Sequence, residues 1–161
     1  MTGALHAGAA RRVVNPPLGT RQTGFRLFGH PVQAIESDLT ATALVLANGH
    51  AKVALIAVDL SILGIDLSLR DARPGQGLRV RVAEALDIPV AHVLINTSHA
   101  HSGVALPDYM PDTDEQIALK RRYREALTRR LVDAAVEADG RLRPARLGCG
   151  WGESAIGVYR R

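Results

Sequence analysis

The sequence has a single cysteine and few aromatic residues. One cysteine, Cys149, cannot form an internal disulfide or a cysteine-based zinc cluster, so any metal ligands must be His, Asp, Glu or Tyr. Aromatic residues make up 4% of the chain, which leaves little surface for stacking nucleic-acid bases. The formal net charge of +4 therefore indicates a mixed, solvated surface, and we expect no nucleic-acid partner.

Long apolar runs are also missing. No stretch approaches the roughly 20 residues that a membrane-spanning helix needs, and residues 1–12 lack the apolar core of a secretion signal. As written, the sequence predicts a cytoplasmic protein without a transmembrane segment, and a secreted one if the N-terminus is trimmed or incomplete. With 161 residues, of which 47% are apolar, we expect one globular unit over 1–161 with no internal boundary.

The first half of the sequence has the features of β-structure. Residues 5–14 include small and β-branched residues and predict a strand. The prolines that follow end this strand. Residues 41–47 and 52–60 are apolar, β-rich runs separated by Asn48-Gly49, the dipeptide typical of a tight hairpin turn. We expect these two runs to pair antiparallel.

Helices and strands alternate in the second half. Leu78, Val82 and Leu86 recur every four residues and predict a helix over 76–86, followed by a strand over 91–96. A longer helix is expected over 112–138, with Thr113 and Gln116 spaced as a capping box, and then a strand over 143–148. The predicted fold class is α/β, with a single mixed β-sheet and crossover helices.

The segment with the clearest chemistry is VLINTSHAHSGV at residues 93–104. Its apolar strand leads into a polar loop that carries His99 and His101, at the strand end where α/β sheets usually place ligands. In extended chain both imidazoles would point to the same side and could face one ion or one substrate group. The spacing is also common in loops where His is merely hydrogen-bonded, and two histidines are fewer ligands than a catalytic zinc site needs.

Other polar and aromatic residues favour structural roles. We interpret Asp59 as a capping or solvated carboxylate, with the orientation of a ligand histidine as the alternative. Cys149 is expected to be a small buried residue, and Trp151 to pack, with contact to lipid as the alternative. The basic group Lys120-Arg121-Arg122-Arg124 is expected on the solvated face of the long helix.

Four sequence blocks resemble the neutral, non-lysosomal ceramidases. They are HAGAARRVVNPPLGTRQTGF at residues 6–25, ATALVLANGHAKVALIAVDL at 41–60, VLINTSHAHSGV at 93–104 and GVYRR at 157–161. The blocks occur in the family's order and extend over nearly the entire chain. The resemblance implies a zinc-dependent amide hydrolase that cleaves N-acylsphingosine, a ceramide, to a sphingoid base and a fatty acid, with a lipid amide as partner and transient contact with a membrane surface.

The resemblance also implies roles for individual residues. His99 corresponds to a zinc ligand, and His101 to a catalytic residue that contacts the substrate and stabilises the oxyanion. Gly24 matches a glycine that lines the pocket, where the absence of a side chain allows close approach. Arg160 matches a catalytic arginine that points into the active site and binds substrate.

The sequence departs from the family pattern at three positions, of which the second and third are expected to reshape the pocket, and it lacks further zinc ligands. Ala100 replaces the usual Thr, Val104 replaces Pro and Tyr159 replaces Asn. The family's other zinc ligands, a His, a Glu and a Tyr, come from sequence beyond the represented segment, so the chain resembles an incomplete, N-terminal part of a larger catalytic domain and is expected to be inactive alone. Two alternatives are a non-catalytic remnant that serves as an interaction module, and a related metal hydrolase acting on another amide or ester.

Overall fold

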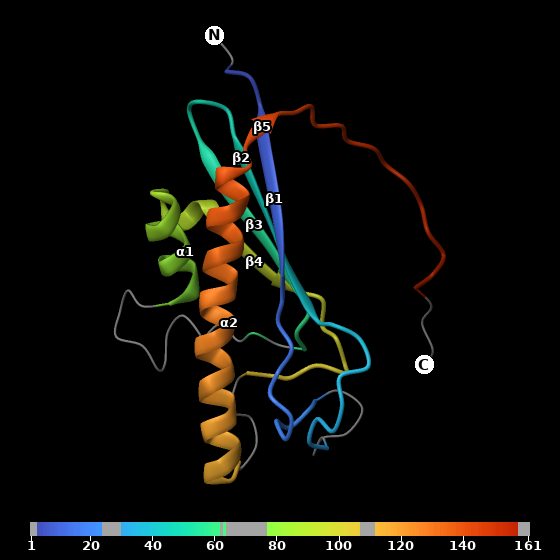
Figure 1. The fold of residues 1–161 in the computed structure, drawn as a ribbon. Helices are drawn as coiled ribbons and strands as arrows, with labels where there is room; N and C mark the ends of the chain where they lie inside the picture. The colour runs from blue at the N-terminus through green and yellow to red at the C-terminus, as the bar shows by residue number, and fades with distance from the viewer. Residues whose placement is uncertain (1–2, 24–29, 62, 64–76, 107–111, 158–161) are drawn as a thin grey trace.

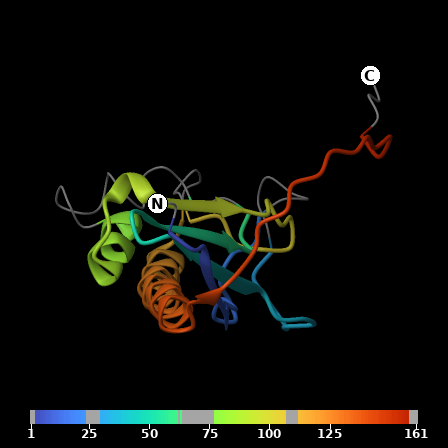
Figure 2. The same ribbon diagram turned by 90° about the horizontal axis from the view of Figure 1, so that it is seen from above.

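The structure is a computed structural model that describes residues 3–23, 30–61, 63, 77–106 and 112–157. Its described part contains one mixed sheet with two α-helices against one of its faces (Figures 1 and 2). The strands are β1 (His6–Val13), β2 (Thr40–Ala47), β3 (Lys52–Val58), β4 (Val93–Thr97) and β5 (Arg143–Pro144). The helices are α1 (Leu78–Leu86), α2 (Asp114–Gly140) and the short 3₁₀-helix η2 (Val90–His92).

The sheet order is β4-β3-β2-β1-β5, and only the β3–β4 pair is parallel. The Asn48-Gly49 turn joins β2 and β3 as predicted, and Gly49 has the positive φ of 80° that this turn requires. The segment that contains α1 connects the parallel pair, which is the arrangement that parallel neighbours need. The predicted α/β class with one mixed sheet is therefore confirmed.

Helix α2 covers the centre of the sheet because both surfaces carry small residues at their contact. Its alanines Ala134, Ala135 and Ala138 are buried, and the facing strands present Ala10, Ala41 and Ala43. A Cβ built on Gly8 would lie 2.0 Å from the carbonyl oxygen of Ala138, so only glycine allows β1 to approach the end of α2. Nearer the start of α2, the buried hydroxyl of Tyr123 donates to the carbonyl of Val14 at 2.6 Å.

Several element boundaries differ from the predicted ones. Residues 90–92 form η2, so the strand expected over 91–96 begins at Val93. The long helix begins after Thr113, whose hydroxyl accepts from the Gln116 amide at 3.3 Å, and ends with Gly140. The strand expected over 143–148 ends at Pro144, because the chain then leaves β1 after a single bond from the Ala145 amide to the Leu5 carbonyl at 2.9 Å.

Three predicted environments are wrong. Cys149 is exposed and Trp151 is 102% exposed, because residues 146–157 follow β5 without contacting a core. Lys120 is only 6% exposed, whereas the sequence predicts it on the solvated face of α2. It forms an ion pair with Asp112, whose carboxylate just before the helix is buried as well.

Candidate functional site

The candidate site lies where the parallel strands β3 and β4 end side by side. Three backbone hydrogen bonds join the two segments that leave them: Ser98 N to Val58 O at 3.1 Å, Ala100 N to Leu60 O at 3.1 Å, and Ser61 N to Val104 O at 3.3 Å. The loop with the two histidines therefore continues the β3–β4 pairing beyond the strands. This fixes its position at the carboxyl edge of the sheet, as the sequence predicted.

His99 has a left-handed backbone conformation, with φ of 57°, and its side chain is oriented by a backbone carbonyl. The Nδ1 atom lies 2.9 Å from the carbonyl oxygen of Ser61. Since a carbonyl can only accept, Nδ1 must carry the proton and donate it, which leaves the lone pair of the neutral ring on Nε2. This is the tautomer that a metal-binding histidine with a carbonyl partner has.

The rings of His99 and His101 are neighbours. Their centroids are 4.8 Å apart with an interplanar angle of 72°, and both residues are exposed. The expected adjacency is therefore present, but its expected cause is wrong. The strand β4 ends at Thr97, so His99 and His101 are not in extended chain. The left-handed turn at His99, and not the side-to-side alternation of a strand, brings the two rings together.

A buried glycine at the end of the loop links it to a second segment of the chain. A Cβ on Gly103 would lie 3.3 Å from the Ala100 carbonyl oxygen and 3.4 Å from the Ser61 nitrogen. A side chain at this position would therefore press on the histidine loop and on the segment that follows β3. The Gly103 carbonyl accepts from the Thr23 amide at 3.1 Å. The predicted pocket residues Gly24 and Arg160 lie outside the described residues.

Asp59 directly follows β3, and its side chain binds the first residue of the neighbouring strand β2. Its Oδ2 atom accepts from both the amide and the hydroxyl of Thr40, each at 3.0 Å. Burial raises the pKa of the Asp59 carboxyl, but hydrogen bonds from Thr40 and Ser98 and the charge of Arg11 outweigh it and hold the pKa below the ordinary value of 3.8. The structure thus confirms the predicted capping role.

The lowered pKa of Asp59 gives an expected pH dependence. A carboxyl whose pKa is lower in the folded than in the unfolded protein stabilises the fold above its ordinary pKa, and this stabilisation is lost as pH falls through the lowered value. We expect Asp59→Asn to reduce the free energy of unfolding near neutral pH and to flatten its decline below about pH 4. Urea unfolding between neutral and acidic pH measures this, with Asp133→Asn, at an exposed position of α2, as the control. Parallel acid limbs in wild type and Asp59→Asn would contradict it.

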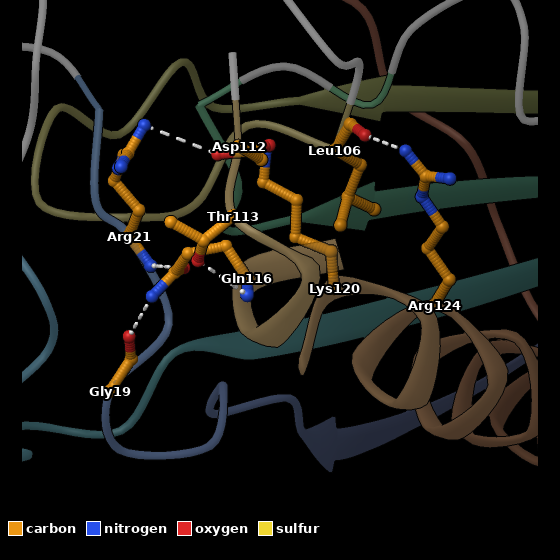
Figure 3. Close-up of polar contacts among 8 residues, drawn as sticks. All are labelled: Gly19, Arg21, Leu106, Asp112, Thr113, Gln116, Lys120 and Arg124. Carbon is orange, nitrogen blue, oxygen red and sulfur yellow. Dashed lines mark hydrogen bonds and ion pairs between the residues drawn. The ribbon is translucent and has the colours of Figure 1, made fainter. Parts of the chain in front are cut away.

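The beginning of α2 holds the segment that precedes Thr23 (Figure 3). The Gln116 side chain does not complete the predicted capping box. Its Nε2 donates to the Gly19 carbonyl at 2.8 Å, and its Oε1 accepts from the Arg21 amide at 2.9 Å. Arg21 also pairs with the buried Asp112 carboxylate at 3.2 Å. These contacts connect α2 through residues 19–23 to the histidine loop.

A cavity of about 620 Å³ opens beside the histidine loop, within the range of small-molecule sites. Ser102 supplies part of its wall from the loop itself. The other lining residues include both apolar and polar ones and come from residues 16–39: Pro16, Gln22, His30, Pro31, Val32, Gln33, Ala34, Ile35, Glu36, Ser37 and Leu39. No local sequence signal indicated this cavity, because all of its walls except Ser102 are distant from His99 in the chain.

The described residues include no group of three or more His, Cys, Asp or Glu side chains arranged to hold a metal ion. His99 offers one suitably oriented nitrogen, and His101 stands beside it. In the same part of the chain, no helix is both long and apolar enough to cross a membrane.

No family profile and no curated protein sequence matches the chain. The solved structure of neutral ceramidase from Pseudomonas aeruginosa matches the structure of this chain, with a TM-score of 0.62 and 14% sequence identity over 88% of this chain. The chain has the fold of one part of neutral ceramidase. A ceramidase complexed with C2 matches over the same share, with a TM-score of 0.57 and 14% identity. The resemblance seen in the four sequence blocks is therefore confirmed at the level of the fold. The chain spans 22% of the length of each ceramidase chain.

Proposed function

We propose that this chain supplies part of the active site of a zinc-dependent amide hydrolase of the neutral ceramidase type. The reaction would release a fatty acid and a sphingoid base from N-acylsphingosine. The observation that carries the proposal is the loop at the carboxyl edge of the sheet. There the Ser61 carbonyl orients His99, with His101 4.8 Å away, in a chain with the fold of a ceramidase segment.

In this proposal the two histidines divide the work. His99 binds zinc through Nε2, because its Nδ1 proton is committed to Ser61. Zinc, when bound, polarises an amide carbonyl and lowers the pKa of a bound water to about 7. His101 donates a hydrogen bond to the oxygen of the scissile amide as negative charge develops on it.

The remaining assignments concern the substrate. The cavity beside Ser102 offers apolar surface for part of a lipid amide and polar groups for its hydroxyls. By resemblance, Gly24 would allow close approach of the substrate, and Arg160 would bind one of its oxygens. A catalytic zinc site has about three protein ligands and an open position, so His99 needs ligands from further polypeptide.

The experiment compares the 161-residue chain with the product of the entire reading frame that contains it. Both are incubated with a fluorescent N-acylsphingosine and zinc, and their metal content is measured by mass spectrometry. We expect weak zinc binding and no hydrolysis by the chain alone, because its zinc site is incomplete. The complete product should bind zinc and show hydrolysis that a chelator abolishes.

Two outcomes would count against the proposal. Chelator-sensitive hydrolysis by the 161-residue chain, lost in His99→Ala, would show that the chain completes the site by itself. A complete product that neither binds zinc nor cleaves the substrate would rule out a ceramidase-type hydrolase.

A further inference from the structure

The side-chain amide of Gln116, in the first turn of α2, binds the backbone of a distant segment, residues 19–23. Its Nε2 donates to the Gly19 carbonyl at 2.8 Å, and its Oε1 accepts from the Arg21 amide at 2.9 Å. One side chain thus supplies both a donor and an acceptor to this backbone, as the edge of a neighbouring strand does. Figure 3 shows the Gln116 side chain between the start of α2 and these two residues.

The segment that Gln116 holds also pairs with a wall of the cavity. The Val32 amide donates to the Thr20 carbonyl, and the Gln22 amide donates to the His30 carbonyl, each at 2.9 Å. Gln22, His30 and Val32 all line the cavity beside the histidine loop. Thr20 is fully buried, so the segment is fixed by contacts within this chain.

At its end the same segment reaches the histidine loop. The Thr23 amide donates to the Gly103 carbonyl at 3.1 Å. His99 is oriented separately, by the Ser61 carbonyl at 2.9 Å. The contacts that start at Gln116 therefore join the cavity wall to the end of the loop, and they do not include the partner of His99.

We propose that Gln116 is a positioning residue that fixes the cavity wall relative to the histidine loop. It acts through the backbone of residues 19–23 and not by contact with the substrate. This inference rests on the proposed function, in which the cavity receives part of a lipid amide. A displaced wall weakens binding of the substrate in the ground state and the transition state alike, which raises KM and leaves kcat unchanged.

A purely local role of Gln116 in capping α2 is the alternative, and it makes a different prediction. In a capping box, the side chain three residues after the N-cap Thr113 binds back to the N-cap amide, and Glu does this as well as Gln. The negative charge of Glu also favours the first turn of a helix. A capping role would therefore survive Gln116→Glu. The bond to the Gly19 carbonyl would not, because a carboxylate has no proton to donate.

Gln116→Glu in the product of the entire reading frame distinguishes the two roles. We expect KM for a fluorescent N-acylsphingosine to rise roughly tenfold, with kcat and zinc content unchanged, as the loss of a hydrogen bond from a fixed wall allows. Gln116→Met keeps the length of the side chain and removes both polar groups, so it should raise KM at least as much. Glu115→Gln, the reverse exchange at an exposed position of the same turn, should leave KM unchanged.

Hydrogen–deuterium exchange of the same proteins tests the positioning without catalysis. Peptides that contain residues 19–23 should exchange about tenfold faster in Gln116→Glu than in wild type, because the segment opens more often. Unchanged exchange would overturn the proposal, and so would faster exchange with an unchanged KM in an active product. A wild-type product that neither binds zinc nor cleaves the substrate would instead contradict the proposed function, and the exchange rates would still decide whether Gln116 holds the segment.

Discussion

If the proposed function is right, replacing His99 by alanine in the product of the entire reading frame is expected to abolish both zinc binding and activity. The substitution removes the ring nitrogen that the Ser61 carbonyl leaves available for the metal. We expect zinc affinity to fall by more than about 100-fold, beyond the 10- to 100-fold loss that removal of an outer-shell partner causes. Zinc titration of the metal-free protein, with hydrolysis of a fluorescent N-acylsphingosine measured in parallel, tests this.

The matched control is His50→Ala, which removes an exposed histidine at the β2–β3 turn. It should retain zinc and activity. Because His99 has a positive φ, His99→Asn is a useful second variant, since asparagine tolerates this backbone conformation better than alanine. If His99→Asn kept the fold and bound zinc as tightly as wild type, His99 would not be a ligand.

Replacing His101 by alanine is expected to separate metal binding from catalysis. The His101 ring lies beside that of His99, with the ring centroids 4.8 Å apart, and we assign it to the developing negative charge on the substrate. Zinc content should remain nearly intact. Both kcat and kcat/KM should fall by about 100-fold or more, because the lost interaction exists mainly in the transition state.

Metal analysis of His99→Ala and His101→Ala beside their kinetics distinguishes the two roles. Equal loss of zinc in both variants would make His101 a second ligand, and the proposed division of labour would be wrong. An increase in KM alone, with kcat unchanged, would instead assign His101 to ground-state binding of the substrate.

The location of the candidate site could be predicted because it depends on local pattern. An apolar run of strand length followed by a polar loop places His99 and His101 at the carboxyl edge of the sheet. The partner of His99 could not be predicted in this way. Ser61 is 38 residues away, and it reaches the ring because β3 and β4 are parallel neighbours whose ends meet at one edge.

The sequence alone determined the elements whose signals involve residues close together in the chain. These include the β2–β3 hairpin with its Asn48-Gly49 turn, and the cap of α2 at Thr113. Tertiary structure decided what depends on distant partners. Lys120 is buried because Asp112 pairs with it, and Gln116 binds Gly19, 97 residues away, in place of completing the capping box.

The same reason explains the end of the described chain. A strand was expected over residues 143–148, but a strand exists only where a neighbour supplies its hydrogen bonds, and β1 pairs with Arg143 and Pro144 alone. Cys149 and Trp151 are consequently exposed in the single chain. Propensity and spacing specify local conformation, whereas burial and pairing depend on the path of the whole chain, which no short stretch of sequence contains.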